Sequence, residues 1–111
     1  MGVVYLLGEN GKENIYKIGV TTGKVENRIK KLQTGNSGEI YLIDQYETEF
    51  PFVMEKQLHQ KYYSDKVKGE WFMLPFEEVT KFKEECKKID DNLKILKEHN
   101  YYFKKKYKNK N

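Results

Sequence analysis

Hydrophobic positions divide the first half of the chain into short segments with different periods. The apolar, β-forming runs at residues 3–7 and 15–21 flank the turn-like stretch GENGKEN and predict a β-hairpin. Apolar residues at helical spacing then predict a helix over residues 24–33, which the breaker cluster TGNSG would end. A third apolar run at residues 40–46 predicts another strand.

The second half of the chain is mainly helical in its pattern. Pro51 suits a first helical position and predicts a helix through about residue 63, whereas residues 69–74 form a turn and an extended apolar segment. Pro75 starts another helix. Apolar residues then recur at steps of three and four: Val79, Phe82, Cys86, Ile89, Leu93 and Leu96. This seam predicts a long terminal helix that either packs on the domain or pairs with a second copy of the chain.

Length and composition favour a single small domain inside the cell. A chain of 111 residues is long enough for one modest core. The single Cys86 excludes an internal disulfide, and no apolar run approaches membrane-spanning length. The N-terminal sequence lacks the basic region and long apolar stretch of a secretory signal. We therefore expect an intracellular, cytoplasmic protein without a membrane partner.

The positive charge of the chain is concentrated at one end. The net charge is +4, but residues 101–111 hold five lysines and no acid, so the rest of the chain is near neutral. The candidate nucleic-acid contacts in this tail are Lys104, Lys105, Lys106 and Lys108, which alternate with aromatic residues. Lysines hold phosphates and aromatic rings stack on bases. The same composition is also typical of a solvated helix end.

Arg28 is the only arginine beside twenty lysines. A guanidinium is planar, permanently charged and able to grip two phosphate oxygens at once, which a lysine does less well. Arg28 follows Val25 by three residues and precedes Leu32 by four, so it lies on the flank of the buried stripe of its helix. If Arg28 has a specific partner, phosphate is the leading candidate, and a chance surface arginine is an equally good interpretation of the composition.

Six short motifs follow one another along residues 3–74. They are VVY at 3–5, YKIG at 16–19, Arg28, LQTGN at 32–36, EKQLHQKY at 55–62 and GEWF at 69–72. Together they resemble the GIY-YIG nuclease superfamily and, more narrowly, its compact branch named for a phage T5 reading frame. Any one motif is weak, but six in this order are specific.

The resemblance implies an α+β fold in which a small three-stranded antiparallel sheet is flanked by helices. The nuclease domain would span residues 1–75. Residues 76–111 would add the long C-terminal helix and the basic aromatic tail, either packed on the same domain or used for a homodimer. The implied activity is cleavage or nicking of nucleic acid, with DNA as the expected partner, and the implied cofactor is one divalent metal ion. Mg²⁺ or Mn²⁺ would suit a site lined mostly by oxygen.

The resemblance also implies roles for individual residues. Tyr5 would help to deprotonate or orient the attacking water, Arg28 would stabilise the pentavalent phosphate, and Glu55 would bind the metal. His59 lies one helical turn after Glu55 and is a further catalytic candidate, although the two could form a simple surface pair. Glu70 is the next candidate ligand should Glu55 not serve.

The second motif departs from the family pattern. Lys17 stands where the family has a tyrosine, and Tyr16 lies one place earlier. Alternate residues of a strand face opposite ways, so only one of them enters the site. We favour Lys17, which would supply a cation beside Tyr5, while Tyr16 stays a candidate for nucleic-acid binding. GEWF stands where the family has a late asparagine, which leaves the final active-site contact open.

Three functions are compatible with these residues. The first is a metal-dependent endonuclease, which the presence of Tyr5, Arg28 and Glu55 favours. The second is a nucleic-acid-binding module of the same fold with little or no cleavage. The third is an interaction protein that uses the terminal helix.

Overall fold

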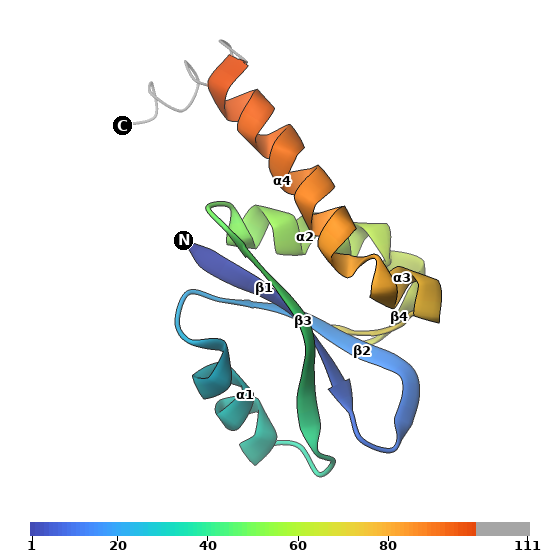
Figure 1. Ribbon diagram of the computed structural model, residues 1–111. Helices are drawn as coiled ribbons and strands as arrows, with labels where there is room; N and C mark the ends of the chain where they lie inside the picture. The colour runs from blue at the N-terminus through green and yellow to red at the C-terminus, as the bar shows by residue number, and fades with distance from the viewer. Residues whose placement is uncertain (100–111) are drawn as a thin grey trace.

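The computed structural model describes residues 1–99, which form one antiparallel sheet with helices on both faces (Figure 1). The strands are β1 (Gly2–Glu9), β2 (Lys12–Thr21), β3 (Ile40–Thr48), β4 (Lys66–Lys68) and β5 (Trp71–Met73), in the spatial order β3-β1-β2-β5-β4. The helices are α1 (Val25–Thr34), α2 (Pro51–Lys61), α3 (Phe76–Thr80) and α4 (Phe82–His99), with a 3-10 turn η1 at Tyr63–Asp65.

The α+β class is confirmed, but the expected number of three strands is wrong because the sheet has five. The two additional strands are the short hairpin β4–β5, which turns through Gly69 at a φ of +56°. Each has only three residues, too few to show a period in the sequence. Their place in the sheet depends on the pairing of β5 with the distant residues Ile15 to Lys17.

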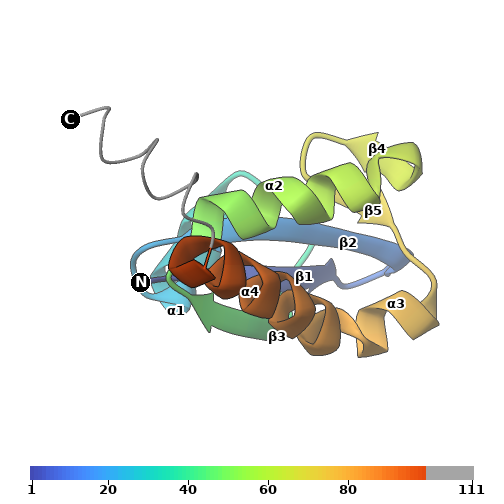
Figure 2. The same ribbon diagram turned by 90° about the horizontal axis from the view of Figure 1, so that it is seen from above.

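Residues of β1 alternate between two apolar clusters, one on each face of the sheet. Val4 and Leu6 belong to the larger cluster, which α2 and α4 complete. Tyr5 and Leu7 belong to the smaller one, together with Ile40. The partly buried side chains of α1 pack against this smaller cluster. Accordingly, α2 and α4 run along the sheet together in Figure 2, and Figure 1 shows α1 apart from them. The helix that carries Arg28 (α1) and the helix that carries Glu55 (α2) thus lie on opposite faces of the sheet.

The C-terminal helical region is not one continuous helix. Lys81 separates the five-residue α3 from α4, so the expected single helix after Pro75 is divided. The first part of the apolar seam packs on the sheet through Phe82 and Cys86, and burial raises the pKa of the Cys86 thiol to about 12. The later part of α4 extends beyond the sheet (Figure 1), where Leu96 is exposed. No helix within residues 1–99 combines the length and apolar character that crossing a bilayer requires.

A buried carboxylate fastens α4 to β3. Asp90 is 3% exposed and accepts a hydrogen bond from Thr48 Oγ1 at 2.6 Å. Its other oxygen lies 3.3 Å from the hydroxyl of Tyr46 and 3.1 Å from the ammonium of Lys94. Each polar group is therefore satisfied by a partner, which is the condition for burying a carboxylate without a large penalty.

We expect Asp90→Asn to lower the free energy of unfolding by about 1–3 kcal/mol near neutral pH, because an amide cannot replace the anion for all of these donors. Burial alone would raise the pKa of Asp90, but the hydrogen bonds from Thr48 and Lys94 outweigh it and hold the pKa below its usual range. This stability is therefore present above the unfolded pKa of about 4 and is lost as the pH falls through the folded value. In urea titrations, the free energies of unfolding of the unmodified protein and of Asp90→Asn should therefore become more similar as the pH is lowered.

Asp91→Asn is the matched control, because Asp91 is exposed and contacts only the exposed Lys87 among the ion pairs of residues 1–99. An equal effect of the two substitutions would mean that the contacts of Asp90 do not fasten the helix.

Candidate active site

The candidate site lies where the pairing between β2 and β5 ends. β5 pairs with residues Ile15 to Lys17 of β2, and the hydrogen bond from Ile18 N to Glu70 O at 3.1 Å follows directly after them. Within the described residues, the rest of β2 has no strand on that side, and α2 packs beside it instead. Side chains from both faces of the sheet can therefore meet around this open edge.

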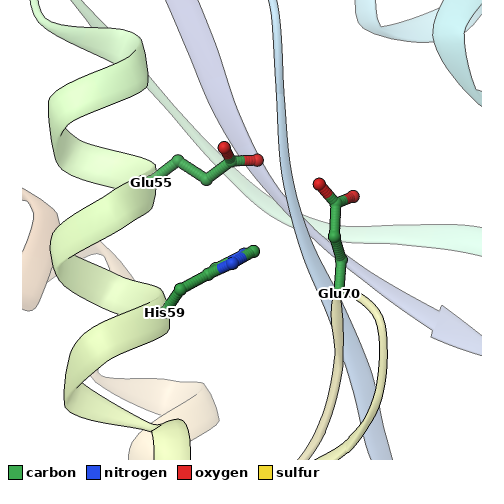
Figure 3. A group of neighbouring side chains, drawn as sticks. All are labelled: Glu55, His59 and Glu70. Carbon is green, nitrogen blue, oxygen red and sulfur yellow. The ribbon is translucent and has the colours of Figure 1, made fainter.

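Glu55, His59 and Glu70 form a cluster of possible metal ligands (Figure 3). One donor atom of each lies within 4.8 Å of the others. Glu55 and His59 are four residues apart on α2, which places them on one side of the helix. Glu70 reaches them from the turn that precedes β5. Two segments distant in the sequence thus supply two carboxylates and one imidazole.

The imidazole of His59 is held in a defined orientation. Its Nε2 lies 2.8 Å from the carbonyl oxygen of Ile18, and its ring packs against Phe72 with the ring centroids 4.9 Å apart. A carbonyl only accepts hydrogen bonds, so Nε2 donates and carries the proton. Nδ1 then has the free lone pair. A backbone contact of this kind is a common way to orient a metal-binding histidine.

Glu55 is the member of the cluster whose carboxylate has a buried oxygen without a partner. Its Oε2 is buried and has no hydrogen-bond partner among residues 1–99. Burial, and then the negative charge of Glu70, raise the pKa of Glu55. Two adjacent carboxylates of which one is partly desolvated are stabilised by a cation between them. The donor set therefore fits a divalent metal ion.

Lys17 contacts Glu70 instead of Tyr5. Its ammonium lies 3.1 Å from Glu70 Oε1 and 5.6 Å from the ring centroid of Trp71. The register places Lys17 opposite Leu7 and Gly19 opposite Tyr5, so Lys17 and Gly19 share a face of the sheet. Lys17 can hold Glu70 in place and balance its charge.

Tyr5 and Arg28 form a pair on the other side of the open edge. Arg28 Nε donates a hydrogen bond of 3.3 Å to the hydroxyl oxygen of Tyr5, which is fully buried. This hydrogen bond raises the pKa of Arg28, which stays charged. Burial raises the pKa of Tyr5 although the hydrogen bond from Arg28 opposes it. Tyr5 is thus a neutral phenol, buried behind the hollow, whose hydroxyl holds the side chain of Arg28.

A glycine makes room for this phenol. A β-carbon at Gly19 would lie 2.6 Å from Cε1 of Tyr5, well inside van der Waals contact. Any larger residue there must displace the ring or the strand, so Gly19 determines where the hydroxyl of Tyr5 lies.

We therefore expect Gly19→Ala to cost about 1–3 kcal/mol of stability, the usual range for overpacking a core. Urea unfolding measures this cost. Gly35→Ala is the matched control, because a β-carbon there meets no atom within 4 Å. Equal unfolding midpoints for the two variants would show that Tyr5 is not positioned by this contact.

An open hollow of about 390 Å³ joins the two halves of the site. It is lined by Val20, Thr21, Thr22, Arg28, Phe52, Glu55 and Glu70. Arg28 and the two carboxylates therefore face one space, although they come from α1, from α2 and from the turn before β5. Within residues 1–99, no carboxylate forms a salt bridge with the guanidinium, so its terminal nitrogens are available to an anion.

The remaining candidates lie elsewhere. Tyr16 packs against the larger apolar cluster on the opposite face of β2 from Lys17. The tail candidates Lys104, Lys105, Lys106 and Lys108 lie outside the described residues. In the LQTGN motif, Gln33 and Asn36 hold the loop before β3: Gln33 Nε2 donates to Gly38 O at 2.8 Å and Asn36 Nδ2 to Glu9 Oε1 at 2.9 Å. Both side chains therefore stabilise this loop.

Sequence reasoning missed Phe52 altogether. Its signal was available, since Phe52 precedes Glu55 by three residues and His59 by seven and so shares their side of the helix.

The fold and this site define a small α+β domain in which a candidate metal-ligand cluster and an arginine line one hollow. Residues 2–87 match the T5orf172 domain. The chain belongs to the T5orf172 domain family, and membership is compatible with a nuclease-type or DNA-binding role. Searches of curated proteins and of solved structures find no match to the chain.

Proposed function

We propose that the protein is a GIY-YIG-type endonuclease that cuts or nicks DNA phosphodiester bonds with the help of a divalent metal ion. The observation that carries this proposal is the hollow in which Arg28 faces Glu55 and Glu70. Hydrolysis of a phosphodiester needs charge stabilisation at the phosphate, a Lewis acid and a positioned water. The motif resemblance and the family membership support the same reaction.

The metal would be held by Glu55, Glu70 and Nδ1 of His59. Oxygen-rich donor sets suit Mg²⁺ or Mn²⁺, and the unpartnered Oε2 of Glu55 supplies the ligand atom that most needs a cation. When bound, the ion supplies Lewis-acid activation at the phosphate. His59 serves as a ligand in this assignment, because the contact of Nε2 with Ile18 leaves only Nδ1 for other chemistry.

The chain's own residues bind and orient the phosphate. Arg28 presents its terminal nitrogens to the equatorial oxygens while Nε stays on Tyr5. The hydroxyl of Tyr5 accepts from Arg28 and so orients the guanidinium. Tyr5 is fully buried in the free protein, so its proton would orient the attacking water only after substrate binding opens the hollow to this hydroxyl. Lys17 acts on Glu70 as a positioning residue. The raised pKa of Tyr5 makes orientation, and not deprotonation, its role.

The test is incubation of supercoiled plasmid, hairpin and branched DNA with Mg²⁺, with Mn²⁺ and with a chelator. We expect nicked or cut products only in the presence of metal. Binding of these DNAs without any product in either metal would contradict the proposal and favour the alternative, a nucleic-acid-binding module of the same fold.

A further inference from the structure

We propose that Phe52 stacks on an unpaired base beside the phosphodiester that is cut, so the substrate is nucleic acid with an unpaired nucleotide at the cut site. The inference rests on the proposed function and names the substrate class of the same site. An exposed aromatic ring lines a hollow whose other lining residues, apart from the partly buried Val20, are polar or charged.

The helix places Phe52 beside the metal cluster. Phe52 is the second residue of α2, and Glu55 and His59 follow it by three and seven residues on the same side. The preceding Pro51 is buried near Gly2, so the start of the helix is anchored to the sheet. Phe52 itself is 62% exposed. The ring of Phe52 is therefore held by an anchored helix and is available to a ligand.

The hollow combines the groups that a nucleotide needs. Arg28 can take the phosphate, the carboxylates can take the metal, and Phe52 adds an apolar surface to the same lining. The volume of about 390 Å³ lies within the range of about 300–1,000 Å³ that is usual for small-molecule sites. An exposed ring elsewhere on the surface lacks these neighbours. Phe76 on α3 is 70% exposed but does not line the hollow.

The ring selects an unpaired base because of how duplexes are built. In a regular duplex, neighbouring bases cover both faces of each base, so an external ring finds no face to stack on. A single strand, a loop, a branch or an extruded nucleotide offers such a face. Stacking on an aromatic side chain contributes about 1–3 kcal/mol per base and tolerates any sequence. The site would thus distinguish substrates by structure and not by sequence.

The first test measures binding by fluorescence anisotropy in a chelator, so that nothing is cut. The probes are a labelled single-stranded oligonucleotide and the same strand in a blunt duplex. We expect Phe52→Ala to weaken single-strand binding about 5- to 150-fold and to leave duplex binding within about twofold. Phe52→Trp should restore single-strand binding. Phe76→Ala, the matched control, should leave both unchanged.

The second test locates the contact with oligonucleotides that lack one base at a time. In the unmodified protein, removal of one particular base should weaken binding by the same factor as Phe52→Ala. In Phe52→Ala that removal should have no further effect, because the ring and the base then form one interaction. Additive losses of affinity from Phe52→Ala and from removal of the base would overturn the inference. Equal losses of affinity for duplex and single strand, or equal effects of Phe52→Ala and Phe76→Ala, would overturn it as well.

These outcomes separate the inference from the proposed function. Metal-dependent nicking without any dependence on Phe52 would overturn the stacking contact alone. Single-strand binding that depends on Phe52, without nicking in Mg²⁺ or Mn²⁺, would overturn the endonuclease and support the stacking contact.

Discussion

Replacement of Arg28 by alanine is expected to reduce nicking by at least about 10²–10³-fold while the protein stays folded. The guanidinium faces the hollow beside the carboxylates, and its charge would stabilise the transition-state phosphate. Its stem is not part of the smaller apolar cluster, so the loss of the hydrogen bond to the buried Tyr5 should cost about 1–3 kcal/mol of stability without unfolding the protein. Single-turnover nicking rates measure the loss, and urea unfolding verifies the fold.

Arg28→Lys should restore little of the activity. The arginine uses Nε to hold the hydroxyl of Tyr5 and keeps its terminal nitrogens for the phosphate, whereas a lysine has one nitrogen for both tasks. Lys31→Ala on the exposed side of α1 is the matched control and should retain full activity. A lysine variant with near-normal rates would show that the forked geometry is irrelevant and that only the charge matters.

The second large effect is expected from Glu55→Gln, which should weaken Mn²⁺ binding by more than about 100-fold and abolish nicking. Loss of an outer contact of a metal site already costs about 10–100-fold, so loss of a direct anionic ligand should cost more. Calorimetric titration with Mn²⁺ measures the affinity. Metal should also raise the thermal midpoint of the unmodified protein but not that of the variant, because only a bound ligand stabilises the folded state.

Without metal, the same variant should be at least as stable as the unmodified protein near neutral pH. The pKa of Glu55 is raised by burial and by Glu70, so the ionised carboxylate destabilises the fold above its unfolded pKa. A neutral amide removes that cost. Opposite effects on metal binding and on the stability of the metal-free protein are expected of a ligand and not of a simple structural residue.

Glu70→Gln should also lose metal affinity, whereas substitution of the exposed Glu84 on α4 by glutamine is the control that should not. Equal Mn²⁺ affinities of the unmodified protein and Glu55→Gln would exclude Glu55 as a ligand. If Glu70→Gln alone then lost the metal, Glu70 would be the principal ligand.

Local patterns in the sequence were sufficient for most of the main elements and for some of the site. The β1–β2 hairpin, α1, β3 and α2 follow from short-range periodicity and from turn and breaker residues, which act over a few neighbouring positions. The composition singled out Arg28, and helical spacing placed Glu55 beside His59. These inferences need only the geometry of one strand or one helix, so no other part of the chain had to be known.

Other features were decided by contacts between distant segments. The pairing of β5 with β2 completed the five-stranded sheet and brought Glu70 to Glu55. The same tertiary packing set Arg28 against the buried Tyr5, directed Lys17 to Glu70 and left Phe52 at the hollow. A sequence specifies which face of an element a residue occupies, but the partners across that face depend on how the elements pack. For this protein, the sequence by itself therefore determined the individual candidates, and only the tertiary structure decided which of them share one site.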